Sequence, residues 1–394
     1  MKKTLSIAIM VALGTASFAS VADIRFNGFA SIVAGTTMDE EESLFGYNDN
    51  FSFKPESIFA LQASADLSDG LSATTQIMAR GENDFEASFE WAYLTYELTD
   101  DSQISAGRMR VPFYRYSDFL DVGYAYNWVR PPTSVYSLNF STYEGISYIN
   151  NHTFGMFDSS IQLLYGGYEG NINVVSDNDP ASLNGLTGVN WTVTYDWLTA
   201  RAAYFAAETS INLSASSDLQ ALSGTLNSVG LTDVVDELLI EDEAGSFFGL
   251  GLSADYNNFI FDAEYTEIDV PNSLVAKQSQ YYASFGYRMD DITVIATIEN
   301  RVDEFEASKF GQVPTTIMHP QFGEVPFADP SNGVLVRDIV DGFLMSQESE
   351  RDTMSLSVRY SFHPAAMFKV DYTTQERKGG DEKSILSAAV NLVF

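Results

Sequence analysis

Apolar and polar residues alternate along most of this chain, and a period of two is typical of β-strands that have one apolar and one polar face. The stretch VNWTVTYDW places Val189, Trp191 and Val193 on one face. Leu356 belongs to such a face in the stretch TMSLSVRYSF, in which serines and an arginine occupy the other positions. Helical periodicity is nearly absent. The pattern therefore predicts an all-β fold.

Sixteen segments carry this alternation. The predicted strands are residues 24–36, 57–68, 71–82, 85–98, 103–114, 142–151, 153–168, 186–198, 199–209, 246–257, 258–268, 278–290, 291–302, 350–362, 365–377 and 383–394. Strands of about 10 residues are long enough to span a bilayer when they are tilted.

The connections between these strands alternate in length. Short links follow the even-numbered strands, at residues 68–70, 99–102, 150–152, 256–258, 289–291 and 361–365. Long links follow most odd-numbered strands, at residues 37–56, 115–141, 169–185, 210–245 and 303–349. Membrane barrels combine short periplasmic turns with long extracellular loops. We therefore expect a sixteen-stranded antiparallel transmembrane β-barrel.

Both ends of the chain agree with this expectation. A basic start, a short apolar stretch and the small residues SVA before position 23 predict a cleaved export signal over residues 1–22, followed by one barrel domain over residues 23–394. The chain ends as SILSAAVNLVF, a strand that stops on the aromatic Phe394. Pairing of this strand with the first one would leave no unpaired edge, which lipid does not tolerate.

Composition narrows the set of partners. The chain has 54 acidic residues against 21 lysines and arginines, a net charge of −33. Nucleic acid is excluded as a partner, because its phosphate backbone requires basic patches. The chain has no cysteine, so disulfides and thiolate metal sites are excluded as well. No apolar run after residue 22 is long enough for a membrane-spanning helix.

The whole chain resembles the Gram-negative general porins. The shared features are the export signal, the start ADIRFNGFAS, the rhythm of short turns and long loops, the long link after the fifth strand and the ending NLVF. That long link lacks the Pro-Glu-Phe-Gly-Gly turn of many enterobacterial members, so its conformation is not carried over. The resemblance implies an outer-membrane location, a homotrimer, contact with lipid and lipopolysaccharide, and a water-filled channel for passive diffusion of small hydrophilic solutes and ions. It also implies that the barrel-assembly machinery recognises Phe394.

The polar strand faces are expected to line a water-filled pore. The charged residues predicted for the pore wall are Arg25, Glu86, Glu90, Arg359, Lys369 and Asp371. Charged side chains are rarely buried unless they are paired or solvated, so these residues indicate an aqueous lumen. Some outward faces of the first strands are rich in small residues, including Gly28, Ala60, Ala63 and Ala65.

Residues 115–141 are expected to fold into the lumen and narrow it, as the corresponding loop does in the porins that the chain resembles. The residues predicted to form the constriction are Arg80, Arg108, Arg110, Arg115, Asp118, Asp121 and Arg130. Arginines that face carboxylates would set a transverse field that selects ions and small polar solutes. The alternative for each residue is that it only fixes the loop in place. An irregularity at Gly107 leaves open which nearby arginine points inward.

Acidic residues concentrate in three of the predicted outer loops. Residues 37–56, 210–245 and 303–349 contain 6, 7 and 8 acidic residues against 1, 0 and 2 basic ones. These residues would attract cations into the pore, bind divalent cations loosely in contact with lipopolysaccharide, or form a solvated surface. We expect a modest preference for cations, and no other cofactor or metal.

A barrel-embedded enzyme would need a histidine near Ser or Asp at the outer rim. His152 and His363 fall in predicted periplasmic turns and His319 in a long loop, so no enzymatic activity is expected.

The closer alternative is a substrate-selective channel for sugars, organic acids or oligosaccharides. Tyr124, Tyr126 and Trp128 could form a stacking track for sugar rings, or the same rings could pack the constriction loop against the wall.

Overall fold

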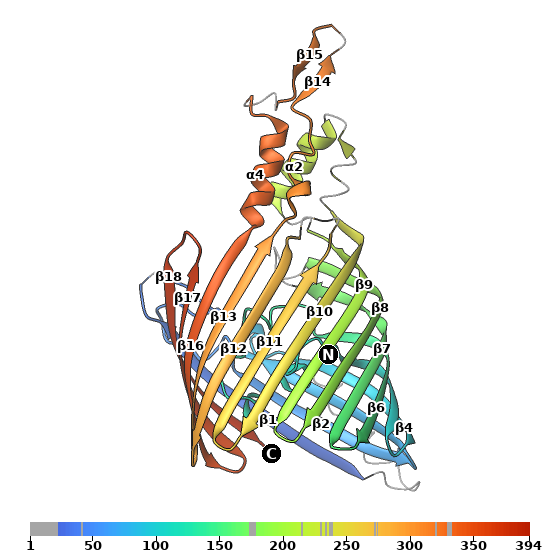
Figure 1. Ribbon diagram of the computed structural model, residues 1–394, viewed down its shortest axis with the longest axis vertical. Helices are drawn as coiled ribbons and strands as arrows, with labels where there is room; N and C mark the ends of the chain where they lie inside the picture. The colour runs from blue at the N-terminus through green and yellow to red at the C-terminus, as the bar shows by residue number, and fades with distance from the viewer. Residues whose placement is uncertain are drawn as a thin grey trace, which may run out of the picture.

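The structure, a computed structural model, describes residues 23–40, 42–172, 179–213, 216–228, 231–232, 235, 239–271, 273, 275–319, 321–328 and 333–394. Within these residues, sixteen antiparallel strands form a closed barrel (Figure 1). They are β1 (Ile24–Thr37), β2 (Ile58–Ser68), β3 (Leu71–Arg80), β4 (Ala87–Thr99), β5 (Ser102–Arg110), β6 (Thr142–Phe154), β7 (Phe157–Ile172), β8 (Asp179–Tyr195), β9 (Leu198–Ile211), β10 (Ile240–Tyr256), β11 (Phe259–Asp269), β12 (Lys277–Met289), β13 (Ile292–Glu304), β16 (Ser349–His363), β17 (Ala366–Arg377) and β18 (Glu382–Val393). The predicted fold is confirmed. The predicted export signal, residues 1–22, lies outside the described residues.

The barrel closes where β1 pairs with β18, and the last residue of the chain takes part in this pairing. The Phe394 N–H donates to the Gly28 carbonyl over 2.9 Å, and the Gly28 N–H donates to the Phe394 carbonyl over 2.7 Å. The Phe394 ring lies against Gly28, where a Cβ atom would come within 2.3 Å of it. The ring is 71% exposed. The terminal aromatic therefore completes the ladder and faces outward at the rim.

The alternation of apolar and polar residues matches the two faces of the barrel wall. Trp191 and Leu356 are 47% and 52% exposed, as expected for side chains that face lipid. Ala60, however, packs with Phe29 and Met78 in an inner cluster, while its neighbour Phe59 is exposed. The prediction that Ala60 points outward is wrong, because successive residues of a strand face opposite sides.

Several strand ends differ from the predicted ones. The predicted turn at residues 150–152 lies inside β6, and the chain turns instead at residues 155–156. Gly155 has a φ of +65° there, a conformation that glycine adopts without steric cost. The long link predicted at residues 169–185 is also too long, since β7 continues to Ile172 and β8 begins at Asp179. Backbone pairing extends these strands beyond the alternating segment.

Two of the predicted long loops form a cap above the barrel, which consists of α2 (Ser217–Ser228), the hairpin β14 (Thr316–His319) and β15 (Gly323–Pro326), and α4 (Val336–Gln347) (Figure 1). Val336, Val340 and Leu344 lie four residues apart on α4, so they form one apolar stripe. This stripe joins Leu222 and Leu226 of α2 in a buried cluster. The cap therefore has its own hydrophobic core. Among the described residues, no helix has the length and apolar character needed to cross a membrane.

The link between β5 and β6 covers residues 111–141 and begins four positions before the predicted loop. Its two ends meet where the Val111 N–H donates to the Ser141 carbonyl over 3.0 Å. Pro112 has no backbone N–H to continue a ladder, and the Phe113 carbonyl accepts from Arg201 over 2.9 Å instead. The strand therefore ends at Arg110, and the chain turns away from the wall.

Candidate pore constriction

Aromatic side chains pack the loop 111–141 against the barrel wall. The ring centroid of Phe113 lies 4.9 Å from that of Phe247 on β10. The ring centroid of Trp128 lies 5.9 Å from that of Tyr282 on β12. Trp128 is 1% exposed and its Nε1 donates to the hydroxyl of Thr297 over 2.8 Å. The apolar surface that these rings bury stabilises the loop against the wall.

Wall charges also hold the loop through its backbone. The ammonium group of Lys369 donates to the carbonyls of Gly123 and Trp128, the latter over 2.6 Å, and the side chain is fully buried. The carboxylate of Asp371 accepts from the Val129 N–H over 2.7 Å. Lys369 and Asp371 were predicted as solvated pore-wall residues. They point inward, but they contact the loop and not open water.

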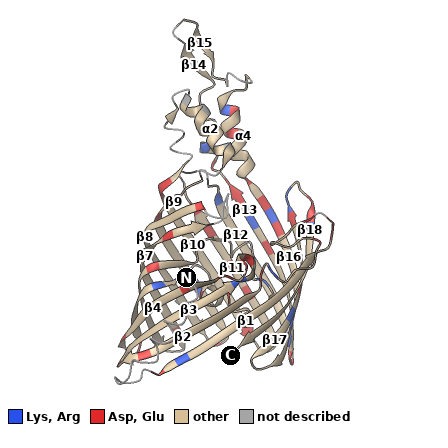
Figure 2. Ribbon diagram, turned by 180° about the vertical axis from the view of Figure 1, so that it is seen from behind, with Lys and Arg blue, Asp and Glu red and all other residues tan. Residues whose placement is uncertain are grey.

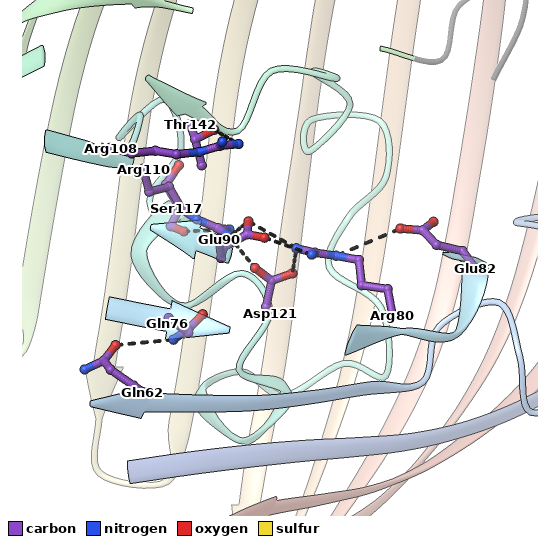
Figure 3. Close-up of polar contacts among 10 residues, drawn as sticks. All are labelled: Gln62, Gln76, Arg80, Glu82, Glu90, Arg108, Arg110, Ser117, Asp121 and Thr142. Atoms are coloured by element: carbon purple, nitrogen blue, oxygen red, sulfur yellow. Dashed lines mark hydrogen bonds and ion pairs between the residues drawn. The ribbon is translucent and has the colours of Figure 1, made fainter. Parts of the chain in front are cut away.

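A charged cluster joins the loop to the other side of the wall, and it consists of Arg80, Glu90, Arg110 and Asp121 (Figure 3). Arg80 Nη1 lies 3.0 Å from Glu90 Oε2, and Arg80 Nη2 lies 2.9 Å from Asp121 Oδ1. Arg110 Nη2 lies 2.9 Å from Glu90 Oε1 and also donates to Asp121 Oδ2. Within the charged cluster each charge therefore meets two charges of opposite sign, and the loop contributes one of the four; Arg80 Nε also lies 3.9 Å from Glu82 Oε1.

Burial makes these ion pairs stronger than pairs on an exposed surface, because buried charges are less screened. The side chains of Arg110, Glu90 and Asp121 are 6%, 9% and 11% exposed. Burial disfavours the charged form of Asp121, yet the guanidinium groups of Arg110 and Arg80 outweigh this effect and lower the pKa of the loop carboxyl below its usual range. The four charges of the charged cluster cancel one another, and Glu82 beside Arg80 adds one negative charge (Figure 3).

Two loop arginines show the reverse arrangement, in which the positive charge lies on the loop. Arg115 donates to Asp262 of β11, and its backbone N–H donates to Glu264 over 2.7 Å. Arg130 makes two parallel contacts of 2.5 Å with the carboxylate of Glu56, a geometry that favours strong binding. The loop is thus tied to the wall and to the segment before β2 at well-separated points.

Arg108, which was also predicted for the constriction, lies outside the charged cluster. Its Nε lies 3.7 Å from Glu144 Oε1 on β6, and its side chain is 44% exposed. The preceding Gly107 has a φ of +138°, a conformation that favours glycine. Arg110, two residues later, is the arginine that enters the charged cluster. Asp118 is exposed and, within the part of the chain that the structure describes, forms no ion pair.

The remaining predicted wall residues lie apart from one another. Arg25 pairs with Asp66 over 3.1 Å in an exposed position near the start of β1. Glu86 precedes β4 and is not on a strand, so its assignment to the barrel wall is wrong. The strand begins one residue later because a 3₁₀ turn and two positive-φ residues, Asp84 and Phe85, come first. Arg359 donates to the Asn127 side chain of the loop over 3.0 Å.

The aromatic track for sugars finds little support in the geometry. Tyr126 and Trp128 are 6% and 1% exposed, so their faces are covered by protein. Tyr124 is half-buried and donates its hydroxyl proton to the Pro364 carbonyl over 2.7 Å. The rings therefore pack the loop. Across the described residues, the acidic and histidine side chains form no group that could hold a metal ion.

Four carboxylates of the site were not in the predicted constriction, namely Glu56, Asp262, Glu264 and Glu90, of which Glu90 was predicted for the pore wall. Asp262 and Glu264 alternate with apolar residues on β11, so they were recognisable as inward-facing. Their pairing with Arg115 joins positions 147 and 149 residues apart. Glu56 lies in an acidic loop, where nothing in the sequence distinguishes it from its neighbours.

Comparisons with known proteins agree with this geometry. A family model described as Gram-negative porin matches residues 6–381. The outer membrane channel DcaP of Acinetobacter baumannii is 12% identical, with a TM-score of 0.56, over 96% of this chain and 100% of that chain. OmpF of Salmonella typhi, in complex with daunomycin, is 14% identical, with a TM-score of 0.52, over 95% and 98%. OmpT of Vibrio cholerae, in a trimer form, is 13% identical, with a TM-score of 0.51, over 95% and 99%. At such identities, the similarity shows a shared fold. No curated protein sequence matches the chain.

Proposed function

The chain belongs to the Gram-negative porin family, and from this premise we propose that the loop 111–141 is a fixed constriction that limits the passage of small hydrophilic solutes and ions. As a member of this family, it is a transmembrane β-barrel of the outer membrane that forms a channel for passive diffusion. The observation that carries the proposal is the charged cluster, in which a loop carboxylate is shared by two wall arginines.

The loop is expected to be rigid because its anchors surround it. They come from β3 to β5 through the charged cluster, from β11 through Asp262, and from β17 through Lys369 and Asp371. Segments with many buried contacts open only at a high free-energy cost. We therefore expect a constant restriction of pore size, without gating by this loop.

Reversal potential across a salt gradient in planar bilayers tests this function. Arg110→Ser removes two contacts from the charged cluster and leaves Glu90 and Asp121 with one arginine, so selectivity should shift toward cations. Arg108→Ser is the matched control, because it also removes one arginine from β5 but leaves the charged cluster intact. Equal selectivity in the two variants would remove Arg110 from the constriction, and a protein without ion steps would not be a conducting channel.

Family and fold are those of a channel, and we infer that the chain has no enzymatic activity. His152 and His363 are exposed on β6 and β16. His363 Nδ1 accepts a hydrogen bond from the Ala365 N–H over 3.1 Å, a contact within a turn. The inference fails if the purified protein hydrolyses peptide or phospholipid substrates at a rate that His363→Ala abolishes.

We infer that the channel is a homotrimer that uses the outer face of β2 to β5. A groove of about 450 Å³ lies there, and its small side chains include Ala65, Ala73 and Ala106. Small residues allow close approach of a second barrel, and one structural relative is described in a trimer form. Ala73→Trp should convert the trimer to monomers on native gels. Ala296→Trp, on the exposed face of β13, is the control that should remain trimeric.

We also infer that the acidic outer loops contact lipopolysaccharide through loosely bound divalent cations. The net charge of −33 would otherwise repel the phosphate groups of this lipid. Co-purified lipopolysaccharide that EDTA does not reduce would contradict the inference.

A further inference from the structure

A second polar site lies outside the constriction, in the outer vestibule between the loop 111–141 and the cap. A cavity of about 910 Å³ is found there. Thr133 and Ser134 of the loop and Phe343 of α4 contribute to its lining. Solutes that enter from outside meet this cavity before they reach the charged cluster.

One wall of the vestibule carries three arginines side by side. Arg301 of β13 lies opposite Arg351 of β16, and Arg351 lies opposite Arg377 of β17. We refer to these three residues as the basic rung. Lys383 of β18 lines the same cavity. Figure 2 shows basic and acidic residues interspersed at the upper ends of these strands. Like charges directly opposite one another destabilise a sheet, so the basic rung lowers the stability of the barrel wall and contributes nothing to its folding.

The protein supplies few counter-charges to the basic rung. Asp303 Oδ1 lies 2.8 Å from Arg301 Nε, and its Oδ2 lies 3.5 Å from Arg351 Nη2 and also accepts from Ser349. Arg377 takes part in no ion pair within the described segments. The Nε of Arg351 is buried and has no hydrogen-bond partner among the described residues. Four basic and two acidic side chains line the cavity, in a chain whose net charge is −33.

Part of the remaining lining of the vestibule is apolar, beside polar side chains such as Gln278, Ser349 and Gln375. Leu213, Leu219, Ile240, Val275 and Phe343 line the cavity beneath the cap. The first three are also buried parts of the cap core. A site with convergent cationic groups and an apolar wall suits a ligand that has an anionic group and a hydrocarbon body. Guanidinium groups bind carboxylate and phosphate oxygens through parallel hydrogen bonds.

We propose that the outer vestibule is a weak binding site for small organic anions, in which the basic rung binds a carboxylate or phosphate group and the cap residues contact its apolar body. This proposal rests on the proposed function, since a solute must be able to enter the channel. The site differs from the constriction because each arginine of the charged cluster pairs with both Glu90 and Asp121, whereas, among the described residues, Arg377 pairs with no carboxylate and Arg351 only with Asp303 over 3.5 Å.

Single-channel recording on the reconstituted mature protein tests the proposal with four anions added on the extracellular side. Benzoate and phenyl phosphate should block the ion current at millimolar concentrations. Acetate and inorganic phosphate have the same charged groups without the apolar body and should block less. Comparison of benzoate with phenyl phosphate identifies the preferred anionic group.

Substitutions locate the block. Arg351→Gln and Arg377→Gln should each raise the half-blocking concentration of benzoate about tenfold, equivalent to about 1.4 kcal/mol. Arg351→Lys keeps the charge but loses the paired donors, so its effect should be smaller. Lys378→Gln is the control, because Lys378 follows Arg377 in the chain but pairs with Glu350.

The outcomes separate this proposal from the proposed function. Ion steps that none of the four anions blocks would overturn the vestibule site and leave the channel function standing. Block that is unchanged in both arginine variants, or equal for acetate and benzoate, would also overturn it. The absence of ion steps would instead contradict the proposed function. Arg377 lies at the end of β17, so its variant remains informative if Arg351→Gln fails to fold.

Discussion

Asp121→Asn is the sharpest test of the charged cluster, because it removes one charge and keeps the size of the side chain. Asp121 contacts both Arg80 and Arg110. The substitution leaves Glu90 as the single carboxylate between two arginines, of which Arg110 is 6% exposed. Removal of one partner from a buried ion pair costs about 3–5 kcal/mol. The local attachment of the loop would therefore weaken by a factor of roughly 10² to 10⁴.

The loop should nevertheless remain inside the barrel, because Lys369, Asp371 and Asp262 hold it elsewhere. We expect the segment around Asp121 to move, which would raise the mean single-channel conductance and the fluctuations of the open current. Selectivity should shift toward anions, since the uncovered guanidinium groups would face the lumen. Single-channel recording at fixed salt measures all three quantities.

Asp118→Asn is the matched control, because it changes the same residue type in the same loop at an exposed position. Surface substitutions of this kind usually change stability by no more than about 0.5 kcal/mol. The control removes one acidic charge but no anchor, so the open current should stay quiet. If both variants show the same conductance and the same fluctuations, Asp121 does not hold the loop and the reasoning fails.

Three further predictions follow from particular contacts. Gly28→Leu should slow barrel assembly in cells, since the new side chain would collide with the Phe394 ring. Gly342→Leu, at an exposed position of α4 with nothing within 4 Å, gives the comparison, and equal assembly rates would contradict the contact. The pKa of Asp121 is lowered in the folded protein, so its ion pairs should persist at every pH above about 3.9, the ordinary pKa of an aspartate. They should weaken only as the pH falls through the lower pKa that Asp121 has in the folded protein. Current fluctuations that rise near pH 6 would contradict this prediction. Leu226→Ala in the fully buried core of the cap should cost about 2–5 kcal/mol and make the cap sensitive to protease, while the barrel keeps its heat-dependent gel mobility.

The barrel could be predicted because each strand has one face toward lipid and one face toward the lumen. Lipid outside and water or packed loop inside impose alternation on residues such as Leu356 and Ser357, which the sequence shows directly. The cap was predicted as two acidic loops, one of which contains TDVVDELLI, a stretch that could form a short helix over the mouth of the barrel; most of that stretch lies outside the described residues. The spacing of Val336, Val340 and Leu344 on α4 was a visible helical signal, but alternation elsewhere in the chain gave no reason to look for a helix there.

The constriction was predictable in its location but not in its pairings. Arg108 and Arg110 are both on β5, but only Arg110 enters the charged cluster. The feature beside them that sets this part of the strand apart is the positive φ of Gly107. The partner of Arg130 is Glu56, which lies 74 residues away in an acidic loop. Such contacts depend on how the loop crosses the lumen, and local sequence carries no information on that path.

Ion selectivity should depend on salt concentration, because the charges that govern it lie in two different environments. Those of the charged cluster cancel, so the exposed acidic loops and the basic rung remain as opposing influences. Screening lengths fall from about 8 Å at 0.15 M to about 3 Å at 1 M salt. Added salt should therefore weaken the influence of the exposed acidic loops before that of the basic rung, whose arginines line the vestibule cavity itself. Reversal potentials measured at rising mean salt should therefore move toward anion preference, and Arg377→Gln should reduce that movement. A cation preference that stays constant across this range would mean that the basic rung does not act on permeating ions.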